Sequence, residues 1–363
     1  MNWSQVVRTG IAAVAVALCI SAQAASNGVT VSISTDKPVL GKFDQVSVNV
    51  TVANTSPTAQ YVLKWFTPFG EIEESLFEVR RDGVKVHYLG ARYKRPAPAA
   101  TDYYLLVPGA SFSTRVELSA LYDMSVTGDY TIGYHARSPI LFDGQQGGSA
   151  AGRREIGELK SQPVTVFIEG RQPRGTLAQE TPTIDAMRAA QAAGSLAFNK
   201  CSASQQGLVT SAVAAGLAMA NDGDSYLNNR RAVGPRYTEW FGATDPSRVA
   251  TIKAHFGALK DAFATKPITV DCGCKKPYYA YVYPTKPYVI HVCSAFWPAP
   301  MSGTDSKGGT LVHEMSHFNV VAATDDWVYG QPDAADLAIS DPAKAIENAD
   351  SHEYFGENMP ALP

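Results

Sequence analysis

Hydrophobic and polar residues alternate in the first half of the chain. Segments 29–35 and 46–52 place apolar side chains at every second position, as a half-buried β-strand does. Turn residues such as Asp82-Gly83 and Gly128-Asp129 separate further short runs of strand composition, at 61–66, 76–79, 84–89, 103–107, 112–118, 130–134 and 164–168. Many short strands at this spacing predict an all-β, immunoglobulin-like sandwich over residues 25–170.

A helical pattern replaces this alternation after residue 195. Residues 204–220 are rich in Ala, Leu and Val. Asp245-Pro246 offers an N-cap and a first-turn proline for a helix over 247–264. Further helices are expected over 310–319 and, after an N-cap at Asp341, over 342–355, with a strand pair at 279–283 and 288–293 beside a cleft. The second half therefore predicts a mainly helical α+β domain over residues 197–363.

Two polar segments interrupt these patterns. The glycine-rich stretch 144–152 is expected to be a flexible loop inside the β-rich region, because the strand at 164–168 follows it. The break between domains is expected at 171–196. It opens with Arg171-Gln-Pro-Arg174 and has the composition of an exposed, cleavable linker.

The first 24 residues have the pattern of a signal peptide. Arg8 precedes an apolar run over 10–20, and Ala22-Gln-Ala24 has the small-x-small form of a cleavage site. The run is shorter than the roughly 20 residues that span a bilayer. No later stretch has the length and hydrophobicity of a membrane helix, so we expect a secreted protein without a membrane anchor.

Composition narrows the class of protein. The chain has 363 residues, 45% of them hydrophobic and 18% charged, which fits about two globular domains. Its formal net charge of −3 is small and gives no support to nucleic-acid binding, which usually requires a basic patch or a strongly basic domain. We expect a monomer.

Loss of the signal peptide removes Cys19 and leaves four cysteines, Cys201, Cys272, Cys274 and Cys293. An even number in an exported protein favours disulfides. A zinc site built from thiolates is the alternative, but Cys-Gly-Cys lacks the usual C-x-x-C spacing. Cys272 and Cys274 lie too close together to bridge comfortably, so each is expected to pair elsewhere.

The strongest chemical signal is His313-Glu314-Met315-Ser316-His317. On a helix, residues four apart share a face, so both imidazoles can reach one ion. Glu314 stands beside the first ligand, where its carboxylate can take a proton from the attacking water. This arrangement is typical of a zinc protease. Ordinary surface or core histidines on a helix are the alternative interpretation.

A catalytic zinc needs a third protein ligand. No histidine follows at the metzincin spacing, and no glutamate is well placed as in thermolysin-like enzymes. Asp326 lies nine residues after His317, which allows the chain to turn and bring a carboxylate back. Asp325 is the competing ligand, and Tyr329 could stabilise an oxyanion.

These residues carry a resemblance to a known family. His313-Glu-x-x-His317 followed by Thr324-x-Asp326-x-x-Tyr329-Gly330 resembles the aspzincin signature of the deuterolysin and peptidyl-lysine metalloendopeptidases. The resemblance implies a zincin-like fold, one Zn²⁺ per chain, Asp326 as third ligand and Tyr329 as transition-state stabiliser. Ala323 replaces the usual glycine of the pattern.

The resemblance extends over residues 197–363 and is closest to the peptidyl-lysine type, because segments 236–242, 293–297 and 303–306 are also similar. It implies the disulfides Cys201–Cys272 and Cys274–Cys293. It also implies that Asp350 and Glu353 line a pocket for lysine, since lysine-cleaving members carry two acidic residues in this motif. Two anions three residues apart on a helix would favour an ammonium, although a solvated acidic face is the commoner explanation. His352 between them is expected to be exposed.

The resulting hypothesis is a secreted zinc metalloendopeptidase that hydrolyses X–Lys bonds in protein or peptide substrates. Glu314 acts as general base, and Tyr329 supports the oxyanion. The β-rich half is expected to be a propeptide that covers the cleft or assists folding until it is cut, with Arg171–Arg174 a candidate region. The alternative is a non-catalytic exported adhesion or binding protein with a structural metal.

Overall fold

The computed structural model describes residues 26–143, 156–171, 194–229 and 232–363. The expected signal peptide, the loop at 144–152 and residues 172–193 of the expected linker lie outside the described residues. In the described part, no helix is both long and apolar enough to cross a membrane.

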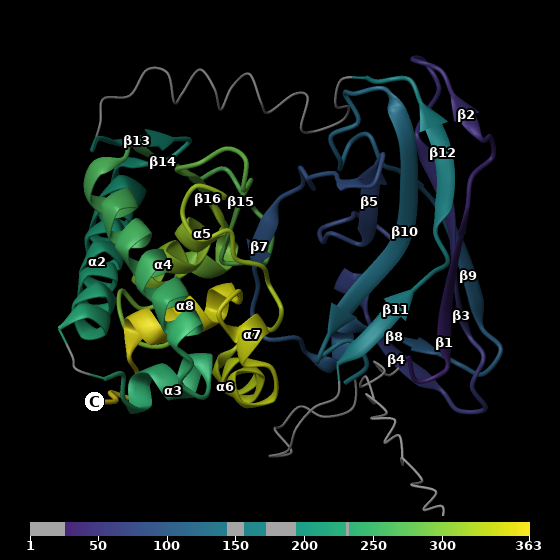
Figure 1. Ribbon diagram of the computed structural model, residues 1–363. Helices are drawn as coiled ribbons and strands as arrows, with labels where there is room; N and C mark the ends of the chain where they lie inside the picture. Colours follow the sequence, from purple (N-terminus) through teal and green to yellow (C-terminus); the bar gives the residue numbers. More distant parts are fainter. Residues whose placement is uncertain (1–25, 144–155, 172–193, 230–231) are drawn as a thin grey trace, which may run out of the picture.

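The N-terminal half is built of strands, as the alternation predicts (Figure 1). In one sheet, β3 lies between two antiparallel neighbours: β1 (Val29–Ser34), β3 (Ser47–Asn54) and β9 (Ser111–Glu117). A larger sheet has the order β2-β12-β10-β5-β6, with β11 also paired to β10: β2 (Val39–Leu40), β12 (Val164–Ile168), β10 (Gly128–Ser138), β5 (Phe77–Arg81), β6 (Val84–Lys85) and β11 (Gly157–Lys160). A separate pair joins β4 (Gln60–Leu63) to β8 (Tyr103–Leu106).

The core of this region follows from the period of two. In β10, side chains alternate between buried and partly exposed along the strand, and Tyr130, Ile132 and Tyr134 are fully buried. Val48, Val50 and Val52 of β3 also enter the same hydrophobic cluster. The region is therefore β-rich, and its assignment to the immunoglobulin-like class stays a prediction.

The C-terminal half combines helices with a five-stranded sheet of order β13-β14-β16-β15-β7. The strands are β13 (Leu196–Asn199), β14 (Ile268–Asp271), β16 (Val289–Val292), β15 (Ala280–Val282) and β7 (Arg92–Lys94). The helices are α2 (Ala203–Asn228), α3 (Pro235–Phe241), α4 (Pro246–Thr265), α5 (Lys307–His317), α6 (Gln331–Ser340), α7 (Pro342–Ala345) and α8 (Ala349–Glu357). Short 3₁₀ turns lie at Lys64–Phe66, Ala100–Asp102 and Ser294–Phe296.

Local capping explains where the long helices begin. Ser202 and Gln205 form a capping box before α2. The Asp245 side chain accepts hydrogen bonds from the backbone of Ser247 and Arg248 at the start of α4, as its sequence predicts. The strand pair expected at 279–283 and 288–293 is present as antiparallel β15 and β16.

The single helix expected over 342–355 is wrong. The chain is helical in α7 and again in α8, but between them Asn348 forms a parallel bridge with Asp325. Backbone hydrogen bonds join Asp325 N–H to Glu347 O and Ala349 N–H to Asp325 O. The backbone near residue 348 therefore forms hydrogen bonds with Asp325 in place of hydrogen bonds within a helix. The helix is interrupted at this point.

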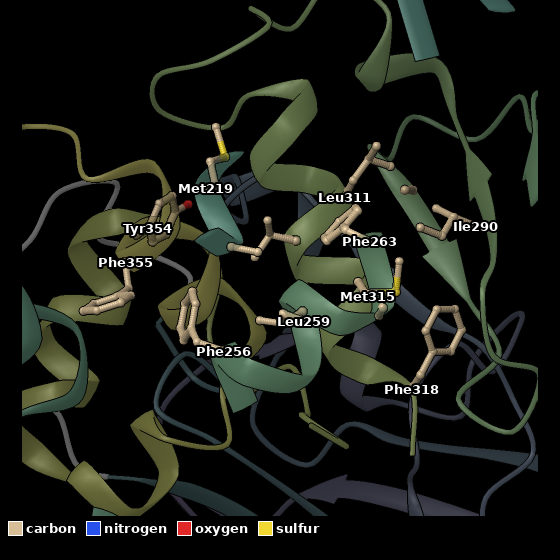
Figure 2. Close-up of a cluster of buried hydrophobic side chains, with 14 of the residues drawn as sticks. Met219, Phe256, Leu259, Phe263, Ile290, Leu311, Met315, Phe318, Tyr354 and Phe355 are labelled. Carbon is tan, nitrogen blue, oxygen red and sulfur yellow. The ribbon is translucent and has the colours of Figure 1, made fainter. Parts of the chain in front are cut away.

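A hydrophobic cluster holds the helices against the sheet (Figure 2). Met219, Phe256, Leu259 and Phe263 from α2 and α4 meet side chains of α5, α8 and β16, among them Ile290, Leu311, Met315, Tyr354 and Phe355. The cluster is drawn entirely from residues after 194. It fixes α5 and α8 relative to each other, and these two helices carry most of the candidate site.

One strand crosses between the two halves. β7 belongs by sequence to the β-rich region, yet it pairs antiparallel with β15 of the C-terminal sheet, and in Figure 1 it lies between the two bodies. The expectation of a separate β-domain over residues 25–170 did not include a strand that joins the C-terminal sheet.

Candidate active site

Helix α5 carries both histidines of the central motif. It begins after Ser306, whose side chain accepts a hydrogen bond from Gly309 N–H, and it ends at His317 because Phe318 is extended. His313 and His317 are both fully buried, and their Nε2 atoms lie 3.1 Å apart. The four-residue spacing therefore brings the two imidazoles to one point, as the sequence predicts.

Asp326 completes this group. After α5 the chain turns at Ala323, which adopts a positive φ of 52°. A non-glycine residue pays roughly 1 kcal/mol or more for this conformation, which explains why the family pattern has glycine there. Asp326 Oδ1 lies 3.2 Å from His313 Nε2, and its Oδ2 lies 3.4 Å from His317 Nε2.

These distances fit a single metal ion. A tetrahedral zinc with bonds of about 2.0–2.1 Å holds its ligand atoms about 3.3 Å apart. Within the described residues, both Asp326 oxygens are buried and accept no hydrogen bond, which suits atoms that ligate a cation. Asp325, the competing candidate, points elsewhere: it is 45% exposed and forms an ion pair with Arg92.

Neighbouring groups orient the two imidazoles. His317 Nδ1 lies 2.9 Å from the Thr324 carbonyl oxygen, so this nitrogen carries the proton and Nε2 keeps its lone pair. His313 Nδ1 lies 2.8 Å from Asp350 Oδ1. A carboxylate behind a ligating histidine is a recurrent support of zinc sites.

Glu314 follows His313 directly on α5. Its side chain is fully buried, and burial raises the pKa of its carboxyl to about 8. Oε1 accepts a hydrogen bond from Lys94 N–H at 3.2 Å, while Oε2 has no partner in the described part of the chain. A carboxylate with one free, desolvated oxygen is suited to take a proton from water.

Tyr329, the proposed oxyanion donor, is buried against the β-rich half. Its hydroxyl donates to the Tyr93 carbonyl oxygen at 3.0 Å and accepts from Arg95 Nη1 at 2.8 Å. Its ring packs edge-on against Trp65 of the β-rich half. Tyr329 can therefore donate a hydrogen bond to a carbonyl oxygen beside the metal ligands.

The acidic pair on α8 forms a second buried group next to the first. Asp350 and Glu353 are both fully buried, not a solvated acidic face. The helix packs closely on α5 because Gly309 has no side chain, and a Cβ there would collide with Glu353 and Glu357. Lys94 Nζ lies 2.6 Å from Glu353 Oε2 and 3.3 Å from Asp350 Oδ1. Together with His313, the pair could also hold a metal by distance alone, but an ammonium already faces it.

The expectation that His352 is exposed is wrong. It is fully buried, its Nδ1 lies 2.9 Å from Asn348 O, and its Nε2 lies 2.9 Å from His255 Nδ1. The cause is that every residue of α8 is buried, so the residue between Asp350 and Glu353 also faces the interior.

Both disulfides that the resemblance implies are present. Cys201–Cys272 and Cys274–Cys293 tie the chain after β13, β14 and β16 together at one end of the sheet. Cys272 and Cys274, separated only by Gly273, pair with different partners.

Sequence reasoning missed the residues that the β-rich half contributes. Four charged residues of that half lie in the site: Glu74, Arg92, Lys94 and Arg95. Asp305 of the protease region was also missed, and its Oδ1 is 3.3 Å from Lys94 Nζ. The run Arg92-Tyr-Lys-Arg95 was the available signal, since it places a lysine in a basic strand-length segment.

Comparisons with known proteins decide the family. A family model described as lysine-specific metallo-endopeptidase, the aspzincins, matches residues 226–357. The extracellular protease of Aeromonas hydrophila is 44% identical over 325 residues, covering 89% of this chain and 91% of that protein. The chain belongs to the aspzincin metalloendopeptidases.

A further relative supports the same family, and one solved structure aligns with part of the chain. The peptidyl-Lys metalloendopeptidase of Armillaria mellea is 33% identical over 356 residues, 95% of this aspzincin and 96% of the relative. A solved zinc peptidase from Grifola frondosa is 44% identical and aligns over 45% of this chain and 100% of its own, with a TM-score of 0.43. From the family model and the two sequence relatives, this aspzincin is a hydrolase of the zinc metalloendopeptidase class, acting on proteins or peptides.

Proposed function

We propose that this aspzincin cleaves proteins on the amino side of lysine, using one zinc ion held by His313, His317 and Asp326. The observation that carries the lysine preference is the buried pair Asp350 and Glu353, which faces a lysine ammonium directly beside the metal ligands. Two buried anions left without a cation are costly, so the pocket favours a substrate side chain that brings one.

The reacting groups then have defined tasks. A zinc ion at the three ligands supplies Lewis acidity toward water and the scissile carbonyl. Glu314 takes a proton from the attacking water and delivers it to the leaving lysine nitrogen. Tyr329 donates a hydrogen bond to the carbonyl oxygen as negative charge develops on it. Asp350 acts twice, through its contact with His313 Nδ1 and as one wall of the pocket.

The β-rich half, residues 25–170, serves as the propeptide of a secreted proenzyme. Its contacts with the protease region support this role: Lys276 Nζ lies 2.8 Å from Glu71 Oε2, Tyr278 donates to Glu73, and Ser138 donates to Trp327 O. The signal peptide at 1–24, the linker at 171–196, the immunoglobulin-like class of the propeptide and a monomeric state belong to the same proposal. The non-catalytic alternative is set aside because the relatives reported above are named as proteases or peptidases.

A cleavage map of a mixed peptide pool tests the function. The pool contains every residue type on both sides of many bonds, and mass spectrometry identifies the products. We expect cuts before lysine from the wild-type enzyme and none from Glu314→Gln. Equal product yields from the two proteins would refute the protease mechanism. Cuts spread over many residue types would leave a protease but refute the lysine preference.

A further inference from the structure

Strand β7 extends the protease sheet at its edge. Residues Lys94, Tyr93 and Arg92 pair with Ala280, Tyr281 and Val282 of β15, in antiparallel register. Without β7, β15 would end the sheet order. An extended peptide that binds a protein commonly adds itself to such an edge through its backbone. β7 therefore lies where an incoming peptide would pair.

The side chain of Lys94 fills the acidic pocket. It is fully buried, and its ammonium is surrounded by the carboxylates of Glu353, Asp350 and Asp305. The rings of Tyr279 and Tyr354 also lie 5.2 and 5.6 Å from Nζ. Although burial opposes its charge, these carboxylates hold the pKa of Lys94 well above its usual range. The pocket is thus occupied by the side chain that it is proposed to select.

The backbone on either side of Lys94 also faces the reacting groups. Lys94 N–H donates to Glu314 Oε1 at 3.2 Å. The carbonyl oxygen of Tyr93 accepts from the Tyr329 hydroxyl at 3.0 Å. The nitrogen and the carbonyl of one peptide bond, Tyr93–Lys94, therefore meet the proposed base and the proposed oxyanion donor together.

An interdomain ion pair alone would not require this arrangement. Neutralising Asp350 and Glu353 needs only a lysine ammonium and leaves the direction and register of its backbone open. Here the side chain, the N–H group and the preceding carbonyl each lie where hydrolysis before a lysine needs them. A cavity of about 220 Å³, lined by Asp326, Arg92 and Glu74 among others, lies next to this group.

We propose that β7 binds the active site as a substrate, and that Tyr93–Lys94 is the bond which this enzyme cuts in its own chain. This inference rests on the proposed function. Until the cut, β7 keeps other proteins out of the cleft. In the cut, the oxygen of one water bonds to the Tyr93 carbonyl carbon and the C–N bond to Lys94 breaks. Glu314 carries a proton from the water to the Lys94 nitrogen, which leaves a carboxylate at Tyr93 and an amine at Lys94.

The sequence explains why the linker is not the self-cleaved segment. No lysine occurs between Lys160 and Lys200, so residues 171–196 offer no X–Lys bond. An enzyme that cuts before lysine cannot cut near Arg171–Arg174, and a cut there requires a protease of other specificity. The proposed self-cleavage in β7 instead separates residues up to 93 from the rest of the propeptide.

The first test follows the full chain with zinc over time, using intact-mass and N-terminal mapping. We expect a fragment that begins at Lys94, formed at a rate independent of protein concentration because the bond is cut within its own chain. Glu314→Gln should stay intact. A first fragment that begins at another lysine, or a rate that rises with concentration, would overturn the proposal.

The second test measures binding without catalysis. In a Glu314→Gln background, fluorescence anisotropy reports the binding of a labelled peptide with one internal lysine. Adding Lys94→Met should tighten binding at least tenfold, because β7 loses its ion pairs in the pocket. Adding Lys160→Met, at an exposed position on β11, is the matched control and should change nothing. Equal affinities for the Lys94 and Lys160 variants would contradict occupation of the pocket.

These results separate the two proposals. If the enzyme cuts the peptide pool before lysine but its own fragments begin elsewhere, self-cleavage fails and the proposed function stands. If the pool is not cut at all, the proposed function fails and self-cleavage fails with it. Should Lys94→Met not fold, as judged by circular dichroism, fragment mapping of the wild-type chain decides alone.

Discussion

Helix α5 and strand β7 both contribute groups to the candidate active site, but they come from different halves of the molecule. α5 packs into a cluster drawn wholly from residues after 194, and its histidines meet an aspartate nine residues downstream. β7 comes from the β-rich half, and its Lys94 ammonium finds all three carboxylate partners in the protease region. The proposed metal ligands and the proposed base therefore all belong to the protease region, whereas Tyr329 and the acidic pair also contact the β-rich half.

Among the three comparisons that follow, the largest effect, on turnover, is expected at Tyr329, which both regions contact. In the active enzyme, Tyr329→Phe should lower kcat about 10²- to 10³-fold with little change in KM, because it removes one donor to the oxyanion. Tyr237→Phe is the control: this buried tyrosine on α3 has no hydrogen-bonded hydroxyl among the described residues. Steady-state kinetics on a lysine peptide measure both. Equal kcat values would remove Tyr329 from the mechanism.

A smaller effect is expected at the proposed lysine pocket, which Lys94 of β7 occupies. Glu353→Gln should lower kcat/KM for lysine substrates about 10- to 100-fold, since a hydrogen bond to a charged group contributes about 1.5–3 kcal/mol. The ratio of lysine to norleucine cleavage should fall with it. Glu239→Gln, an exposed acid on α3, is the matched control. An unchanged ratio would place lysine recognition elsewhere.

The smallest effect, on stability, concerns two histidines that belong to the protease region alone. Burial lowers the pKa of His255 to about 4 and that of His352 to about 3. Between about pH 6.5 and pH 4 the unfolded chain therefore binds protons that the folded chain does not, so stability falls as the pH falls through this window.

Urea unfolding at pH 7.0 and pH 4.5 measures this dependence. His255→Gln removes one of the two rings, so the difference between the two midpoints should shrink. A difference of the same size in this variant and in the wild type would show that other groups cause the acid sensitivity.

The sequence predicted what depends on neighbours along the chain. The spacing of His313 and His317, the N-cap at Asp245 and the alternation in β10 each follow from a local period or cap, and each is present. Asp326 was preferred to Asp325 by its spacing to Tyr329, and it is Asp326 that lies beside the imidazoles.

Features that depend on contacts between distant segments were not predictable in this way. The helix expected over 342–355 breaks because the backbone near Asn348 pairs with Asp325, which no local propensity indicates. His352 is buried together with every other residue of α8. Lys94 N–H meets Glu314 across 220 positions of the chain, and only the fold brings them together.

The central claim is that one ion is held by His313, His317 and Asp326 within the protease region. Elemental analysis of the purified full chain by inductively coupled plasma mass spectrometry tests this claim without reference to activity. We expect about one zinc per chain in the wild type and in Asp325→Ala, and loss of the metal in folded Asp326→Ala. Retention of zinc by Asp326→Ala, or its loss from Asp325→Ala alone, would contradict the account.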